Sequence, residues 1–166
     1  KLVDPLLRTT LVERDATGEI IKLTDPAGGV TSVTRDAKGN SLMVVKPDGA
    51  ATSFIRNDRG QVTEVHFANG GRSAIEYDQH ANPVALTLPG GARWQWTYDH
   101  FGRRTSETDP TGATRRFVLD DRGDLVSVHH PNGAVTRFAF DGEGRPVRVT
   151  DQNGGSTEIV WGGLNR

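Results

Sequence analysis

The most regular acidic positions in the sequence recur every 21 residues, and carboxylates at a fixed spacing could bind calcium ions. The series is Asp15, Asp36, Asn57, Asp78, Asp99, Asp120 and Asp141, followed three residues later by Gly18, Gly39, Gly60, Ala81, Gly102, Gly123 and Gly144. The calcium-binding nonapeptide solenoid has a different period, with paired glycines around its Asp. An Asp or Asn oxygen accepts a backbone hydrogen bond two residues on, which closes a turn. We therefore predict turn-forming residues and no metal site.

Aromatic residues are densest around Trp94, and such a cluster could stack on sugars. Trp96 and Tyr98 fall at positions that are mostly apolar in the other repeats, so we predict that they pack against the rest of the protein. Trp94 stands where other repeats carry Thr, Ser or Arg. It is therefore the candidate surface-binding residue of the chain.

Histidine and glutamate side chains are the remaining candidates for chemistry. No histidine pair has zinc-ligand spacing with a third partner. Glu107 interrupts an otherwise apolar series and has Arg104, Arg115 and Arg116 as neighbours in the sequence. A catalytic acid there is one interpretation, and we favour an ion pair or a solvated surface position, because structural networks also hold carboxylates. The five histidines are His66, His80, His100, His129 and His130.

No nucleophile elbow, phosphate-binding loop, metalloprotease helix or dinucleotide fingerprint occurs in the sequence. The chain has 20 basic and 21 acidic residues, so it lacks the excess positive charge typical of nucleic-acid binding. It has no Cys. No apolar run approaches the length of about 20 residues that spans a membrane. We expect no catalytic residue, no cofactor, no nucleic-acid partner and no membrane span.

The elements that position these residues are short strands between two kinds of turn. A second turn, mostly Pro-x-Gly, repeats with the same period and ends at Gly28, Gly49, Gly70, Gly91, Gly112, Gly133 and Gly154. Segments of about seven residues separate the turns, and they alternate apolar with small or polar residues, which predicts half-buried strands. Short connections make neighbouring strands antiparallel. The fold class is therefore all-β, with about eight 21-residue hairpin repeats in a long antiparallel ribbon that we expect to coil.

The repeat resembles the RHS or YD repeat, whose signature is a Tyr-Asp pair followed, after two further residues, by a Gly. Tyr98-Asp99-His100-Phe101-Gly102-Arg103 fits this signature, as does the Tyr77-Asp78 pair. Most other repeats replace the Tyr with Arg, Leu or Phe, and Ala81 replaces one Gly. The resemblance covers residues 1–166, with incomplete repeats at both ends and no separate second domain.

The resemblance implies a structural, non-catalytic segment of a bacterial toxin shell that encloses a C-terminal toxin. Such shells are made in the bacterial cytoplasm and delivered to a target cell, often by a type VI secretion machine. The implied partners are the rest of the same polypeptide and the enclosed toxin, with a secretion-machine loader as a further candidate. The alternative is a secreted or cell-surface module that binds carbohydrate or a protein partner, with Trp94 as its contact residue.

Overall fold

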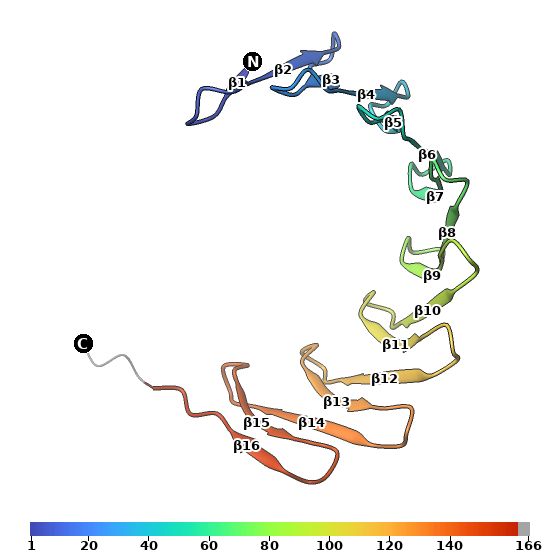
Figure 1. Ribbon diagram of the computed structural model, residues 1–166. Coiled ribbons are helices and arrows are strands. Elements are labelled where there is room, and N and C mark those ends of the chain that lie inside the picture. The colour runs from blue at the N-terminus through green and yellow to red at the C-terminus, as the bar shows by residue number, and fades with distance from the viewer. Residues whose placement is uncertain (163–166) are drawn as a thin grey trace. The chain divides into compact units, whose positions relative to one another are not determined.

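The computed structural model describes residues 1–162, which form short strands and turns without a helix (Figure 1). The strands are β1 Leu2–Val3, β2 Thr9–Arg14, β3 Ile20–Thr24, β4 Val30–Arg35, β5 Ser41–Val45, β6 Ala51–Arg56, β7 Val62–His66, β8 Arg72–Tyr77, β9 Pro83–Thr87, β10 Arg93–Tyr98, β11 Arg104–Thr108, β12 Thr114–Leu119, β13 Leu125–His129, β14 Val135–Phe140, β15 Pro146–Thr150 and β16 Ser156–Glu158. The predicted all-β class is confirmed.

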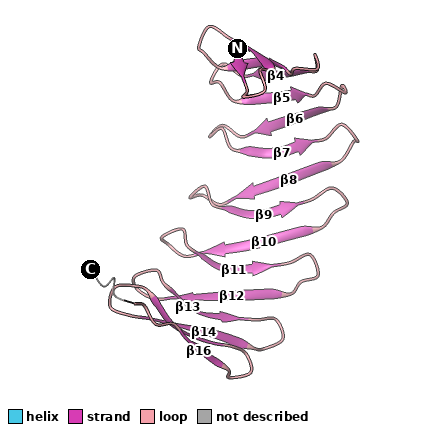
Figure 2. Cartoon of the chain, turned by 60° about the vertical axis from the view of Figure 1, so that its left-hand side comes forward, coloured by secondary structure: helices cyan, strands magenta, loops and turns pink. Residues whose placement is uncertain are grey.

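The strand order in the sheet is the order of the sequence, from β1 to β16 (Figure 2). The chain divides into two compact units. One contains residues 1–76 and 87–91, and the other contains residues 77–86 and 92–166. In both units each strand follows its predecessor through a short turn and runs antiparallel to it. The predicted hairpin repeat is therefore present in each unit.

Two kinds of hairpin alternate along each unit, and they differ in register. Hairpins closed by the Pro-x-Gly turn have a regular ladder, as in β13–β14 where Val128 lies opposite Thr136. Hairpins closed by the Asp turn have a register shift, as in β12–β13, where Leu119 lies opposite Leu125 although Val118 lies opposite Ser127. One extra residue after each such turn makes a β-bulge, which bends a strand and increases its twist. The bulges thus mark one end of each repeat.

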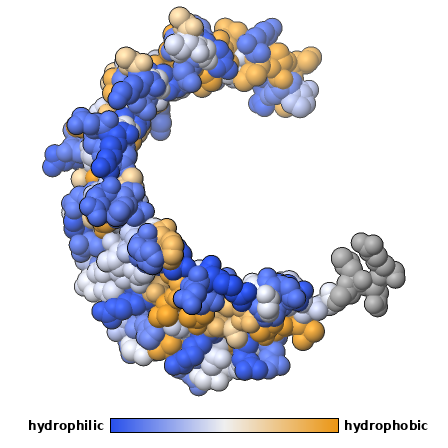
Figure 3. Space-filling view, turned by 180° about the vertical axis from the view of Figure 1, so that it is seen from behind, coloured by the Kyte–Doolittle hydropathy of each residue, from blue (hydrophilic) through white to orange (hydrophobic). Residues whose placement is uncertain are grey.

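The sheet is a single layer within each unit, and it buries very little. Among residues 1–162 only Ala85 and Ser73 are less than a tenth exposed, at 1% and 6%. Apolar side chains lie open on the surface, most visibly over the N-terminal hairpin, where Leu6 and Leu7 are 73% and 82% exposed (Figure 3). The chain exposes 11390 Å², whereas a globular monomer of its mass exposes roughly 8,000 Å². The strands therefore form without an enclosed core of their own.

Candidate functional site

The Asp of each predicted turn accepts hydrogen bonds from the backbone of its own turn. In the repeat that begins at Asp99, the N–H groups of Phe101 and Arg103 both donate to Asp99 Oδ1 over 2.9 Å. The Gly102 N–H donates to the Asp99 carbonyl over 3.0 Å. Asn57 makes the equivalent bonds through its amide oxygen, to the N–H groups of residues 59 and 61. A carboxylate is not required for the turn, because an amide oxygen accepts the same hydrogen bonds.

The fourth residue of the Asp turn, which is Gly in most repeats, has a left-handed backbone in each repeat. Gly18, Gly39 and Gly60 have φ angles of 90°, 84° and 81°. Two non-glycine residues share this conformation, Ala81 at 72° and Leu7 at 61°, and both stand at turn positions that hold Gly in other repeats. A side chain in this region costs about 1–2 kcal/mol. These two turns therefore carry backbone strain that the others avoid.

A side chain four residues after the Asp occupies its second oxygen, a partner that the sequence pattern did not reveal. Arg103 Nε donates to Asp99 Oδ2 over 2.6 Å, and Arg145 Nε donates to Asp141 Oδ2 over 2.7 Å. The amide of Asn40 takes the same place on Asp36 at 2.9 Å. These bonds, first from the Asn40 side chain and then from its backbone, hold the pKa of Asp36 below its ordinary value. Such a hydrogen-bonded carboxylate is a poor general base.

Most of the Pro-x-Gly turns have the same backbone geometry as the Asp turns. The Gly28 N–H donates to the Asp25 carbonyl over 3.0 Å, and Asp25 N–H donates to the Gly29 carbonyl over 2.9 Å. The turn is therefore a three-residue loop with a left-handed last residue, a common hairpin connection. At Asn69-Gly70 only the glycine has a positive φ angle, so this pair forms the same loop. The turn at Pro89 differs, because Gly90 and Gly91 both have positive φ angles, of 95° and 90°.

In several repeats the residue at the position before the turn Asp links neighbouring hairpins. Tyr98 Oη donates to the Pro83 carbonyl over 2.8 Å, across 15 residues of sequence. Arg35 Nε and Trp161 Nε1 make the corresponding bonds to the carbonyls of Ile20 and Pro146, over 3.3 and 2.7 Å. Tyr, Arg and Trp share one property at this position, a long side chain that ends in a donor. This shared property accounts for part of the sequence variation at the Tyr of the signature.

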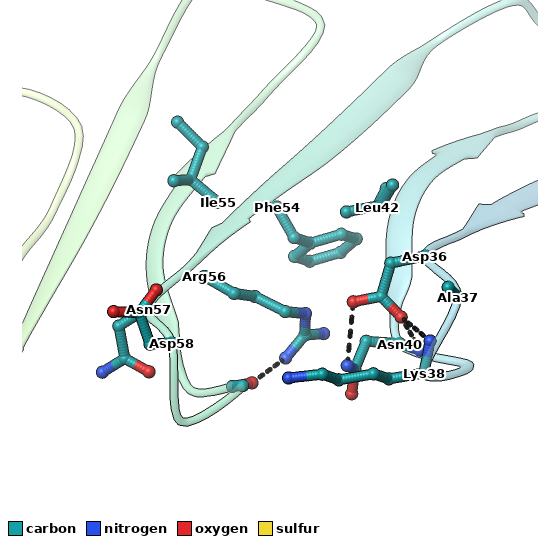
Figure 4. A pocket seen from close by; sticks show the side chains of 11 residues that line it. Asp36, Ala37, Lys38, Asn40, Leu42, Phe54, Ile55, Arg56, Asn57 and Asp58 are labelled. Atoms are coloured by element: carbon teal, nitrogen blue, oxygen red, sulfur yellow. Dashed lines mark hydrogen bonds between the residues drawn. The ribbon is translucent and has the colours of Figure 1, made fainter.

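A hollow of 520 Å³ lies between the Asp36 and Asn57 turns (Figure 4). Phe54 and Leu42 contribute apolar side chains to it, and Arg56 points toward the turn that follows its strand. Arg56 Nη1 donates to the Gly60 carbonyl over 2.8 Å. Asp36 already accepts bonds from its own turn. Lys38 and Asp58 also line the hollow, while the turns hold Asp36 and Arg56 through hydrogen bonds.

One face of each unit collects the apolar strand residues, and we call it the apolar face. It is defined by cross-strand pairs that include Phe54 with Val65 in one unit and Phe117 with Val128 in the other. Trp94 and Trp96 alternate along β10 and so share this face. Trp94 is half-buried there, and its role as a binding residue stays a prediction.

Glu107 also lies on the apolar face, where it contacts two arginines. Arg104 Nη1 donates to Glu107 Oε2 over 3.2 Å, and Arg115 Nη2 lies 3.7 Å from Oε1. The preferred interpretation of Glu107 as an ion-pair partner is confirmed. Arg116, the third neighbouring cation in the sequence, lies opposite Ser106 and His129 on the other face.

The histidines lie apart from one another or make local contacts. His66 Nε2 lies 2.8 Å from Glu64 Oε2, and His130 Nε2 lies 3.0 Å from Thr136 Oγ1. Within residues 1–162 no three His, Cys, Asp or Glu side chains gather as metal ligands would. The same residues contain no helix long and apolar enough to cross a membrane.

The family comparison matches two stretches of the chain that contain these turns. The model of the RHS repeat matches residues 77–114 and 120–157. The chain carries RHS repeats. No curated protein matches this RHS-repeat chain at a significant level.

Several solved structures share the fold of the RHS-repeat chain. The crystal structure of TcdB2-TccC3-TEV is 16% identical with a TM-score of 0.74, over 90% of this chain and 10% of that one. The Photorhabdus luminescens Tc holotoxin pore is 14% identical with a TM-score of 0.57, over 85% and 12%. TcdB2-TccC3 without its hypervariable C-terminal region is 15% identical with a TM-score of 0.56, over 92% and 10%. The chain thus spans about a tenth of the length of these proteins.

Proposed function

We propose that the chain is a non-catalytic stretch of wall in a shell that encloses a toxin. The observation that carries this proposal is the near absence of buried side chains, with Ala85 and Ser73 alone below a tenth exposed among the described residues. An apolar face that stays uncovered loses the free energy of burying it. A wall with cargo or further repeats against that face regains this free energy.

The repeat chemistry supports a passive role. The turn carboxylates of Asp99 and Asp141 accept hydrogen bonds from backbone N–H groups of their own turns. Hydrogen bonds to the charged form stabilise it and hold the pKa of Asp141 low, chiefly through the Arg145 backbone N–H. General acid–base catalysis favours a group whose pKa lies near the working pH. These carboxylates are therefore suited to closing turns.

The mechanism we propose is steric exclusion. Within each unit the strand ladder leaves no opening between neighbouring hairpins, and the side-chain donors Tyr98 and Arg35 tie their hairpins to the preceding ones. The enclosed domain then reaches its substrate only after release. By its resemblance to bacterial RHS toxins, the parent protein is made in the bacterial cytoplasm and delivered to a target cell by a type VI-type machine, with a loader domain as a further partner.

Limited proteolysis of the parent protein tests the proposal. The enclosed domain is expected to be cleaved more slowly in the intact parent than as an isolated domain. Phe138→Asp places a charge on the apolar face opposite Val149, and it should make the enclosed domain more sensitive to protease. The matched control Ala139→Asp places the same charge at an exposed position on the other face and should change little. Equal cleavage of the enclosed and isolated domains would disprove the proposal.

A further inference from the structure

Three positions of the chain depart from the repeat pattern by carrying a charge. Glu107 occupies a position that holds Leu or Val in the other repeats, as at Leu86 and Val128. Arg115 stands where other repeats carry Thr, Ser or Trp, and Arg104 stands where they carry Ile, Ser, Val, Pro or Leu. The fold therefore requires no charge at any of these positions, because the neighbouring repeats form the same strands without one.

The three departures meet on the apolar face over β10–β12. Glu107 lies directly opposite Trp96 on one side and opposite Arg115 on the other. Arg104 and Arg115 both contact the Glu107 carboxylate, at 3.2 and 3.7 Å. The Arg104 guanidinium also lies over the Trp96 ring, 5.2 Å from its centre. Residues distant in sequence by up to 19 positions thus build one cluster.

The charges of this cluster do not balance. Two guanidinium groups face one carboxylate, so the cluster carries one net positive charge. The Glu107 side chain is 19% exposed, while those of Arg104 and Arg115 are 43% and 52% exposed. The carboxylate is therefore largely covered, and the side chains of both arginines remain partly accessible to solvent. A guanidinium has five N–H donors, and one carboxylate occupies at most a few of them.

The surroundings make this charge excess costly once the apolar face is covered. The pairs that follow on the same face, Phe117 with Val128 and Phe138 with Val149, are uncharged. Covering a charge without a counterion is strongly unfavourable, whereas a paired and hydrogen-bonded charge is tolerated. The charge excess therefore favours one additional anionic group at the cluster.

We propose that Arg104 and Arg115 form a binding site for one carboxylate, carried by an acidic side chain of a polypeptide that lies on the apolar face. The planar guanidinium groups match the geometry of a carboxylate. Trp94 and Trp96 offer aromatic surface to the apolar residues that flank the acidic side chain. Glu107 holds the two arginines in place and limits the affinity, because it competes for the same donors.

Peptide binding to the 166-residue chain tests the site. The probes are the capped peptides Leu-Glu-Leu and Leu-Gln-Leu, and the readout is the shift of the indole N–H signals in nuclear magnetic resonance spectra. We expect the Glu peptide to bind about tenfold more tightly, because a hydrogen bond to a charged group is stronger than its neutral counterpart. The Trp96 signal should move most. Equal affinity of the two peptides, or no binding of either, overturns the proposal.

Variants taken from the repeat pattern separate the site from general charge effects. Arg115→Thr restores the residue of Thr136 and should abolish the preference for the Glu peptide, and Arg115→Gln should do the same if the first variant folds poorly. Glu107→Val restores the residue of Val128 and should increase the preference. Arg116→Ser removes the same charge from the opposite face and should leave the preference unchanged. An equal effect of Arg116→Ser and Arg115→Thr contradicts the proposal.

Discussion

The hydroxyl group of Tyr98 offers a single-atom test of how neighbouring hairpins are joined. Tyr98→Phe removes the bond from Oη to the Pro83 carbonyl, which is 2.8 Å long, and leaves the ring in place. An intramolecular hydrogen bond contributes about 0.5–1.5 kcal/mol net to stability. Because water reaches this exposed bond, we expect a loss in the lower half of that range. This corresponds to roughly a two- to fivefold rise in the unfolding equilibrium constant.

The chain contains the reverse experiment at Phe140. Phe140 occupies the position of Tyr98 two repeats later, and it lies opposite Pro146 as Tyr98 lies opposite Arg104. Phe140→Tyr places a hydroxyl group where the carbonyl of Leu125, 15 residues earlier, is the expected acceptor. The substitution should therefore stabilise the chain by a similar amount. One substitution thus removes a hydroxyl oxygen at this repeat position, and the other adds one.

Urea unfolding followed by circular dichroism measures both effects, with amide hydrogen exchange as a local readout in the affected hairpins. In a chain of this size a change of 1 kcal/mol shifts the melting temperature by about 2–4 °C. Tyr98→Phe should lower the urea midpoint, and Phe140→Tyr should raise it. If Tyr98→Phe leaves both midpoint and local exchange unchanged, the hydroxyl bond does not join the hairpins and the reasoning is wrong.

Three further predictions concern the turns. Ala81→Gly should stabilise the chain by about 0.5–1 kcal/mol in urea unfolding, because relief of left-handed strain exceeds the added freedom of the unfolded chain. Gly39→Ala should destabilise the chain, because Gly39 has a φ angle of 84°, although there is open space where its Cβ would lie. Changes of the same sign for both substitutions would contradict this account. Asp36 and Asp141 have lowered pKa values in the folded state, so their stabilisation is present above the ordinary carboxyl pKa of 3.8 and is lost as the pH falls below it. A urea midpoint that stays constant from pH 5 to about 2 would refute this. Asp36→Asn should keep the fold, as Asn57 does, and should weaken this acid dependence in the same titration.

Local rules made the strands and turns predictable from the sequence. Asp99 and Gly102 act within their own turn, so their spacing alone indicates the hydrogen bonds that they make. Closeness in sequence suggested the ion pair of Glu107 with Arg104. Strict alternation would place these two residues on opposite faces, and the register shift between Thr97 and Tyr98 brings them to the same face. Alternation along each segment predicted which residues share a face.

Contacts that depend on register could not be predicted in the same way. The bulge between Val118 and Leu119 shifts the pairing by one residue, and no residue type at this position of the repeat predicts that shift. The bond from Tyr98 to Pro83 joins residues 15 positions apart and becomes visible only once the strands are aligned. The second arginine of Glu107 comes from the next strand for the same reason.

The scarcity of buried side chains has a consequence for how far such sequences can diverge. In a packed core each volume change is felt by several neighbours, which restricts the residues that a position accepts. A chain in which only Ala85 and Ser73 are buried among the described residues has few positions of that kind. The residues of the two turns and the alternation of apolar with polar residues along each strand are enough to specify such a fold. This explains how a protein with only 16% identity can follow the same path with a TM-score of 0.74.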